Sequence, residues 1–526
     1  MKRRCGARAL LGLLGCLVIL LGALPPVALG AEKPGQGHVD AALRKRAAEQ
    51  PGATLSVIVY RTSAGAGGDA VRRRGGRDER QLKTAHAVAA EVPADQIEAL
   101  ASEPGVARVA PDPPVKLLAK PEQVAGGLQT AYPYAVRAAE LWQGPTPIRG
   151  TGVGVAVLDS GLDQHSDFLG SRTVGKTERP GPNRVVRRVA IRTDEQGGPG
   201  DDNGHGTFVA GVIAGRGWGE RNSRADDGDY VGVAPDANLI GIKVSDRDGM
   251  SRTSDVIRGI EWAIENRSLY NIRVLNLSLQ SAAPEPYTYS LLDAAVEMAW
   301  LKGIVVVVSA GNMGADSLRY APANDPYVIT VGATDDQGTR TVDDDRLAWF
   351  SSYGLTQSGH AKPELVAPGR RIVSTLSSTT DPLARAYPDR VLGGLYIRLS
   401  GTSAAAPVVT GVVAQLLQAR PELTPDQVKW QLMQTAHPIP GPGTGAGYPQ
   451  AAAAVRYAGP VERANRGLVP NRLVALAAQA ALASQSNPSW DNISWDQVAW
   501  DNISWDNISW DEMAWENISW DTVAGD

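Results

Sequence analysis

Ser403 is the residue in this chain whose surroundings first suggest nucleophilic chemistry. It follows Gly401-Thr402 and opens an Ala-rich apolar run with helical spacing. A serine hydroxyl is a weak nucleophile until a base accepts its proton. The backbone N–H groups at a helix N-terminus can stabilise a developing oxyanion. Taken alone, this tripeptide is more simply interpreted as a turn that caps a helix.

Two residues upstream favour the catalytic interpretation. Asp159 ends an apolar run typical of a buried strand, and His205 lies between glycines in Asn203-Gly204-His205-Gly206-Thr207, ahead of an apolar helical run. A serine hydrolase needs an imidazole base and a carboxylate that holds the imidazole in one tautomer. Alone, Asp159 could be a turn cap and His205 a loop histidine. Together with Ser403 they predict a triad.

The segments that must position these residues alternate between strand and helix from about residue 132 to 458. The sequence predicts strands at 154–158, 239–244, 274–279 and 304–308, and helices at 255–266, 290–302, 406–418 and 425–435. Near-continuous apolar strands alternating with helices predict an α/β fold with a doubly wound, mostly parallel sheet and helices on both faces. In such sheets the functional site lies beyond the carboxyl ends of the strands.

The first thirty residues predict a secretory signal peptide. Basic residues at positions 2–4 precede an apolar run, and Ala28-Leu29-Gly30 has the form of a cleavage motif, so we expect cutting after Gly30. A retained membrane anchor and a lipoprotein box ending at Cys16 are the alternatives. Both cysteines of the chain, Cys5 and Cys16, fall here, so the mature chain is expected to lack a disulfide and a cysteine nucleophile.

Composition sets the broad class of the protein. Its 526 residues are enough for two or more units. Hydrophobic residues make up 43% and charged residues 21%, an ordinary globular balance. The net charge of −4 provides no basic surface for nucleic acid. No stretch after the signal peptide has the roughly 18 consecutive apolar residues that a membrane span needs, so we expect no transmembrane segment in the mature chain.

Residues 31–120 predict a small α+β unit. Strands are expected at 55–60 and 106–112 with a helix at 95–101, and prolines follow as a linker. The position of this unit, between a signal peptide and the larger α/β unit, favours a propeptide.

The C-terminal region has a different organisation. Residues 459–487 form a Pro/Gly/Arg-containing connector and an Ala-rich helix, and residues 488–526 carry a tryptophan every five positions from Trp490 to Trp520. A period of five keeps the tryptophans on one face of neither a strand nor a helix. We therefore expect a separate tail, with the cell envelope as a candidate partner.

Four motifs place the larger unit in a known family by resemblance. The segments "AVLDSGLD", "NGHGTFVAG", "VVSAGN" and "GTSAAAPVVTG" resemble those of the subtilisin-like serine proteases, and "VPADQIEALASEPGVARVAPD" resembles the end of the inhibitory propeptides of secreted subtilases. The resemblance implies a peptidase domain over about 121–458 and an inhibitory propeptide over 31–120. It implies a secreted serine endopeptidase that hydrolyses polypeptides through an acyl-enzyme and matures by losing its propeptide.

The resemblance also assigns roles to individual residues. Asp159 is implied to orient the imidazole, His205 to act as general base and then acid, and Ser403 to be the nucleophile. The Asn312 side-chain amide is implied to donate to the oxyanion beside the Ser403 backbone N–H.

The same resemblance implies where a substrate binds. A polypeptide is expected to extend along Ser278-Leu279-Gln280-Ser281 by strand addition, with Ala310 and Gly311 also contacting it. The family often has Gly-Gly where this chain has Gln280-Ser281. The sequence therefore leaves the side-chain preference of the site open.

Metal binding and a second function remain open at this stage. No cofactor is required for the expected chemistry, but family members often bind structural Ca²⁺ through oxygen ligands. Acidic residues flank the His205 helix, although such clusters are commonly solvated loops: Asp194, Glu195, Asp201, Asp202, Asp226, Asp227 and Asp229. The tryptophan repeat supports an alternative, a surface-display or binding protein built on a subtilase scaffold.

Overall fold

The computed structural model describes residues 38–61, 66–82, 87–117, 130–143, 145–174, 177–192, 198–219 and 230–475. The predicted signal peptide and the tryptophan repeat lie outside these residues.

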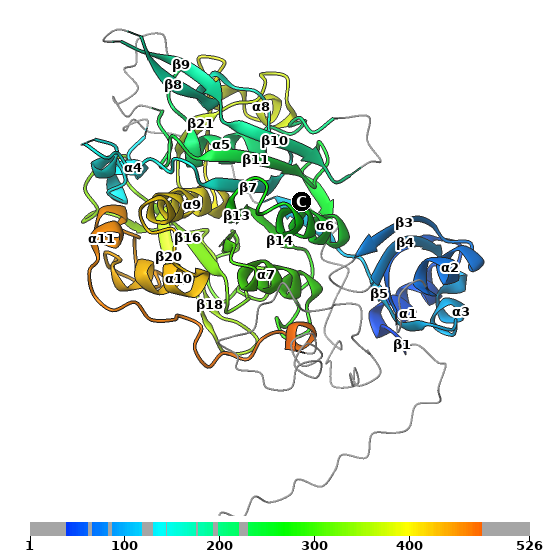
Figure 1. Ribbon diagram of the computed structural model, residues 1–526. Coiled ribbons are helices and arrows are strands. Elements are labelled where there is room, and N and C mark those ends of the chain that lie inside the picture. Colours follow the sequence, from blue (N-terminus) through cyan, green and yellow to red (C-terminus); the bar gives the residue numbers. More distant parts are fainter. Residues whose placement is uncertain are drawn as a thin grey trace, which may run out of the picture.

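The larger unit is built on an eight-stranded sheet, and the predicted α/β fold with a mostly parallel, doubly wound sheet is confirmed (Figure 1). Its strands, in spatial order, are β10 (Val185–Ala190), β11 (Asn238–Lys243), β7 (Gly154–Asp159), β13 (Ile272–Leu277), β15 (Val305–Ser309), β16 (Ile329–Asp335) and the antiparallel β17 (Arg346–Leu347), with β20 (Leu365–Pro368) parallel to β16. β7 and β15 are buried along their whole length and β13 is buried except at Arg273, as expected for strands covered on both faces.

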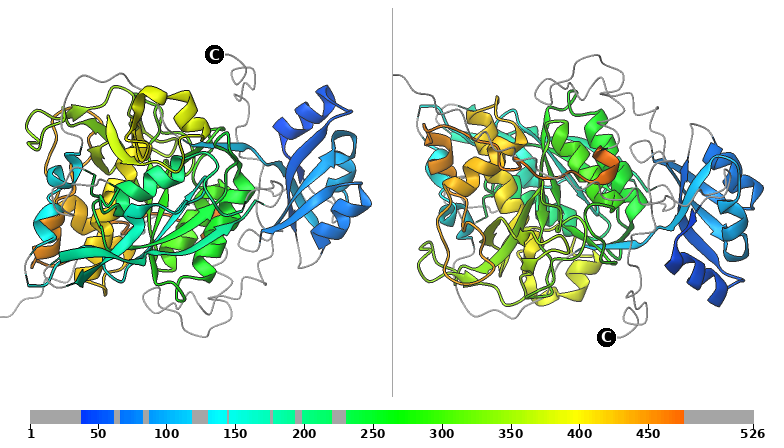
Figure 2. Two further views of the ribbon diagram at one scale, coloured as in Figure 1. Left: turned by 90° about the horizontal axis from the view of Figure 1, so that it is seen from above. Right: turned by 90° about the horizontal axis from the view of Figure 1, so that it is seen from below.

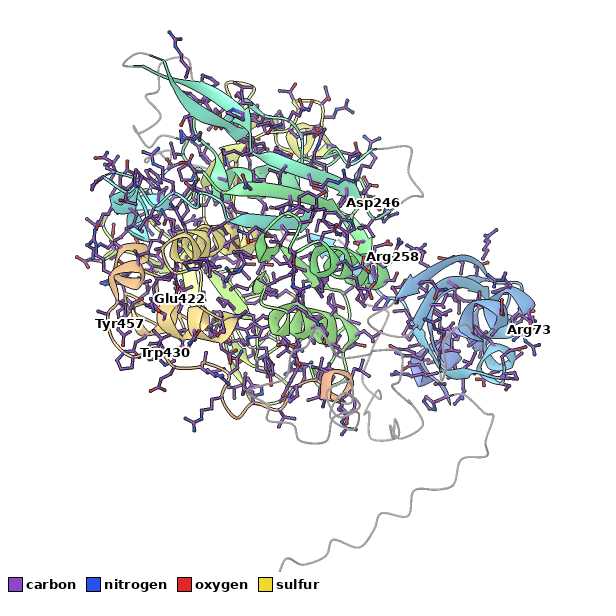
Figure 3. The ribbon with its side chains drawn as sticks, viewed as in Figure 1. Arg73, Asp246, Arg258, Glu422, Trp430 and Tyr457 are labelled. Atoms are coloured by element: carbon purple, nitrogen blue, oxygen red, sulfur yellow. The ribbon has the colours of Figure 1, made fainter. Side chains whose placement is uncertain are left out.

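Two pairs of helices cover this sheet. The first pair is α5 (His205–Ala214) with α9 (Thr402–Ala419), and the second is α6 (Thr253–Glu265) with α7 (Leu291–Leu301). By length and composition α9 could cross a membrane, but it is mostly buried in the body and is the core helix of the fold. Next to α9 lie α10 (Pro425–Gln434) and α11 (Ala451–Arg456), where the Trp430 and Tyr457 rings meet with centroids 5.8 Å apart (Figure 3).

Shorter elements lie around the main sheet. Paired strands are β8 (Leu169–Val174) with β9 (Thr177–Asn183), β18 (Gly354–Leu355) with β19 (Ala361–Lys362), and β23 (Tyr396–Leu399) with β21 (Ile372–Thr375) and β22 (Val391–Leu392). Short helices and 3₁₀ turns are α4 (Tyr132–Ala135), α8 (Pro382–Ala386), η2 (Ala139–Leu141), η3 (Ser166–Phe168) and η4 (Pro388–Arg390).

The N-terminal unit is a five-stranded sheet with helices on one face. Its strand order is β1 (His38–Val39), β5 (Val106–Pro111), β2 (Thr54–Arg61), β4 (Ala87–Pro93) and β3 (Arg77–Leu82). The helices are α1 (Ala41–Glu49), α2 (Ala66–Arg73) and α3 (Ile97–Ala101), the last preceded by η1 (Ala94–Gln96). The unit projects from one end of the body beside α6, and a strand runs from it into the body (Figure 2).

The sheet of this unit is apolar on both faces, for different reasons. Val57 and Val59 of β2 face the helices of the unit and belong to its own core, whereas Ile58 and Tyr60 belong to the apolar cluster of the larger body. Successive residues of a strand point to opposite faces. One face therefore makes the unit stable, and the other attaches it to the larger body.

The chain beyond residue 458, predicted as a connector, packs against the body as far as residue 475. Leu473 and Val474 are buried in the main core. The Asn471 backbone N–H donates to Glu297 Oε2 at 2.9 Å, and its side-chain amide donates to the Ser290 carbonyl at 2.8 Å. We call residues 459–475 the C-terminal strap.

Candidate active site

Asp159 and His205 meet at the carboxyl end of the central strand. Asp159 is the last residue of β7 and His205 the first of α5, and Asp159 Oδ1 lies 2.7 Å from His205 Nδ1. Both side chains are buried. Gly206 allows this approach, because a Cβ there would lie 2.1 Å from the Gly161 carbonyl oxygen. The predicted pairing of Asp159 with His205 is thus present in the geometry.

Asp201 holds the first turn of α5 in place, a function the sequence did not reveal. Its Oδ1 accepts from Ser160 Oγ at 2.7 Å and from the Gly204 N–H at 2.8 Å, and its Oδ2 accepts from the Thr207 N–H at 2.7 Å. A carboxylate at a helix N-terminus satisfies N–H groups that have no partner within the helix. Asp201 therefore positions His205 by fixing the backbone on both sides of it, at Gly204 and Thr207.

The charge of Asp159 determines how His205 titrates. Burial lowers the pKa of His205, but the Asp159 charge, the hydrogen bond to Asp159 and the Asp201 charge together raise the pKa above the usual histidine value. The imidazole must be neutral to accept a proton. The neutral base therefore forms at a higher pH than for a free histidine.

Ser403 is the second residue of α9, which begins four residues earlier than the helix predicted from residue 406. The position of Ser403 at a helix N-terminus, which its motif predicted, is nevertheless present. Here Pro407 lies inside the helix and supplies no N–H to the Ser403 carbonyl, four residues back. The Ser278 hydroxyl donates to that carbonyl instead, at 3.2 Å.

The nucleophile candidate is oriented toward Ser278 rather than toward the imidazole. Ser403 Oγ donates to the Ser278 carbonyl at 3.3 Å, and within the described part of the chain His205 Nε2 has no hydrogen-bond partner. Hydrogen bonds between catalytic groups are often long in the absence of a reacting substrate. Nucleophilic catalysis by Ser403 would require its hydroxyl to turn from the Ser278 carbonyl toward this base.

Asn312 is tied to the residue that precedes Ser403. Its Oδ1 accepts from the Thr402 N–H at 2.9 Å and from Thr402 Oγ1 at 3.1 Å. Thr402 Oγ1 in turn accepts from the Gly311 N–H at 3.1 Å. An amide donates through its nitrogen, so the proposed oxyanion contact of Asn312 would use Nδ2 and not Oδ1. Thr402 is a positioning residue that sequence reasoning missed.

A strand of the chain itself pairs with the segment that was predicted to bind the substrate. Residues Leu279–Ser281 form β14, which pairs antiparallel with β6 (Pro114–Leu117), and β6 pairs on its other side with β12 (Met250–Arg252). Leu117 is opposite Leu279 and Lys116 is opposite Gln280. Ala310 and Gly311 follow β15 directly. The chain that leaves the N-terminal unit therefore occupies the place expected for a polypeptide substrate.

The acidic residues considered for Ca²⁺ do not form a ligand cage where they are described. The oxygens of Asp201 accept hydrogen bonds from the protein, and Asp202 forms an ion pair with Lys243. In the described ranges no group of three or more His, Cys, Asp or Glu side chains is arranged to hold a metal ion. Asp201 and Asp202 thus do not fit a calcium site. The other candidates, Asp194, Glu195, Asp226, Asp227 and Asp229, lie outside the described residues.

Comparisons with known proteins show what the chain is similar to. Residues 150–471 match the family model described as the subtilase family. The chain is 40% identical over 302 residues to the serine protease AprX of Bacillus subtilis, covering 56% of this chain and 63% of AprX. It is 35% identical over 289 residues to subtilisin BL of Lederbergia lenta, covering 55% of this chain and 85% of that protein.

A solved structure is also similar. Fervidolysin from Fervidobacterium pennivorans, described as a keratinolytic enzyme related to subtilisin, matches with a TM-score of 0.56 and 28% identity. The match covers 78% of this chain and 62% of fervidolysin. The matched region thus spans less than two thirds of both AprX and fervidolysin.

Proposed function

The chain belongs to the subtilase family of serine endopeptidases, and we propose that it hydrolyses polypeptides through Asp159, His205 and Ser403. The observation that carries this proposal is the 2.7 Å hydrogen bond between Asp159 and His205 at the sheet edge where α9 begins with Thr402-Ser403. A buried carboxylate bonded to Nδ1 leaves Nε2 as the proton acceptor, which is the arrangement that nucleophilic catalysis by serine requires.

The chemistry follows from these positions. His205 Nε2 takes the proton of Ser403 Oγ as the oxygen bonds to the substrate carbonyl carbon. The negative oxygen of the tetrahedral intermediate accepts from the Asn312 amide and from the Ser403 backbone N–H. The C–N bond then breaks as His205 returns the proton to the leaving amine. Water attacks the resulting acyl-enzyme with the same base and releases the acid product.

We further propose that residues 31–120 are an inhibitory propeptide and that the protein acts outside the cell. Support for the propeptide comes from β6, which lies between β12 and β14 and so blocks the segment where a substrate would bind. The predicted signal peptide supports secretion. Contact of the tail with the cell envelope remains part of this proposal, supported by the tryptophan repeat.

Covalent labelling tests the peptidase function directly. A fluorophosphonate probe reacts with a serine only where a base and an oxyanion site activate it. We expect the mature protein to be labelled on the peptide that contains Ser403, as mapped by mass spectrometry. A surface-display protein on the same scaffold would stay unlabelled, and that result would favour the alternative.

Inhibition by the separate propeptide tests the zymogen proposal. Asp112 Oδ1 accepts from the Ser254 N–H at 3.1 Å at the start of α6, and Asp112 Oδ2 accepts from Ser254 Oγ at 2.5 Å. Added as a separate chain, residues 31–120 are expected to inhibit the mature enzyme. Asp112→Ala should weaken inhibition about tenfold or more, because hydrogen bonds to a charged group are lost. Asp95→Ala, at an exposed position, is the matched control.

The same contact gives inhibition a defined pH dependence. Burial raises the pKa of Asp112 from the ordinary 3.8 to about 6, although the hydrogen bonds from Ser254 lower this pKa. The bound propeptide therefore keeps a proton that the free propeptide loses between these values, so a lower pH favours the complex. We expect the inhibition constant to increase about tenfold from pH 5 to pH 7 and the Asp112→Asn variant to lose this dependence. Inhibition that strengthens with rising pH would contradict the argument.

A further inference from the structure

The pairing of β6 with β14 locates the residue that would be cut. The two strands are antiparallel, with Lys116 opposite Gln280 and Leu117 opposite Leu279. In a polypeptide bound in this register, the residue after the one opposite Leu279 would lie opposite Ser278, whose carbonyl accepts from Ser403 Oγ at 3.3 Å. A polypeptide that pairs with β14 as β6 does would therefore present one carbonyl to Ser403. That carbonyl belongs to the residue opposite Ser278.

Strand geometry determines which side chain of the protein lies beside that residue. Side chains two positions apart along a strand share a face, and residues opposite each other in an antiparallel pair also share a face. Gln280 is two positions from Ser278 and is 5% exposed. The side chain of the substrate residue before the cut thus enters on the face of β14 from which Gln280 projects.

The Gln280 side chain crosses from this strand to the segment that precedes Asn312. A Cβ placed on Gly311 would lie only 2.8 Å from Gln280 Oε1, so the carboxamide occupies the space beside the Gly311 backbone. Gly311 has a φ of 106°, which favours glycine. The Gly311 N–H donates to Thr402 Oγ1 at 3.1 Å, and the Gly311 carbonyl accepts from the Ser352 N–H at 2.9 Å. Hydrogen bonds to Thr402 and Ser352 therefore fix the Gly311 backbone that the Gln280 side chain reaches.

We propose that Gln280 closes the pocket for the side chain of the residue before the cut, so that the enzyme favours a medium-sized aliphatic residue over an aromatic one. The inference rests on the proposed peptidase function and deepens it by naming the substrate preference. The carboxamide lies beside the Gly311 backbone, so an aromatic ring that enters on this face would meet it, whereas a shorter aliphatic side chain would end before it. In the sequence, the residue that follows Leu117 is a leucine.

The test compares two substrates that differ only in the residue before the cut. The peptide p-nitroanilides Val-Lys-Leu-Leu and Val-Lys-Leu-Phe follow the chain's own sequence from Val115. We expect the mature enzyme to have a kcat/KM roughly tenfold higher or more for the leucine substrate. Gln280→Gly should raise kcat/KM for the phenylalanine substrate by roughly 10–100-fold, mainly through a lower KM. The leucine substrate should change much less.

Gln280→Met is the matched control, because methionine retains most of the length and volume of glutamine without its amide. If bulk closes the pocket, this variant keeps the preference of the parent for leucine. A parent enzyme that prefers phenylalanine, an unchanged ratio in Gln280→Gly, or a Met variant that behaves like the Gly variant would each overturn the proposal. If a variant fails to fold, a parent enzyme that prefers phenylalanine still overturns the proposal. Hydrolysis of neither substrate by the parent would instead contradict the peptidase function itself.

Discussion

Replacing Ser403 with alanine is expected to abolish peptide hydrolysis, with a loss of about 10⁶-fold in kcat as found when the nucleophile of subtilisin is removed. The change deletes only one oxygen atom, which donates to the Ser278 carbonyl. Folding should therefore persist. If maturation is autocatalytic, the variant should also keep residues 31–120 attached. Hydrolysis of a peptide substrate and the N-terminal sequence of the purified protein measure the two effects.

The exposed Ser358, in the turn between β18 and β19, supplies a matched control. Ser358→Ala is expected to retain both hydrolysis and maturation. Full activity in a purified, folded Ser403→Ala protein would remove Ser403 from the mechanism. A processed N-terminus on an inactive Ser403→Ala protein would leave the nucleophile assignment intact and show that another protease cuts the propeptide.

Shortening the chain to residue 458 is expected to prevent stable folding, whereas shortening it to residue 483 should leave peptidase activity unchanged. The first change removes the C-terminal strap, and the second removes residues 484–526, which include the tryptophan repeat. Burying Leu473 and Val474 contributes about 1.5–3 kcal/mol for each side chain. With the hydrogen bonds of the strap, the loss approaches the roughly 5–15 kcal/mol that stabilises a typical domain.

The buried acidic side chain beneath the strap increases this effect. Glu297 is fully buried and accepts from the Asn471 N–H, and burial followed by the charge of Asp325 raises its pKa well above the usual range. Without the strap Glu297 loses this donor. Thermal unfolding and peptidase assays of the two shortened chains measure the difference. An active, stable chain ending at 458 would contradict a structural role for the strap, and loss of activity in a folded chain ending at 483 would make the tail part of the catalytic unit.

The sequence alone was sufficient for the features that depend on short segments. Asp159 after an apolar strand and His205 between glycines are local patterns, and the structure brings these two side chains within 2.7 Å of each other. The alternation of apolar strands and helices predicted the sheet, because burial on both faces requires near-continuous apolar runs. The predicted strand at 154–158 differs from β7 by one residue.

Partners that are distant in the sequence could be found only in the tertiary structure. Asp201 looked like part of an acidic loop, yet its carboxylate caps α5 and contacts Ser160, 41 positions away. The sequence also placed the boundary of the catalytic unit at residue 458, whereas the strap continues packing against α7. The local sequence does not distinguish a capping carboxylate from a solvated one, because the two differ only in the donors that folding brings to them.

The proposed pocket beside Ser403 illustrates the same division. The sequence showed that Gln280-Ser281 departs from the family pattern, but it contained no information on where the Gln280 side chain lies. That depends on Gly311, 31 positions away, whose missing Cβ leaves room for the carboxamide. The sequence therefore determined which residue types the proposed chemistry uses, because they lie within local motifs. The tertiary structure decided which side chains surround the reacting groups, because those contacts join segments that only folding brings together.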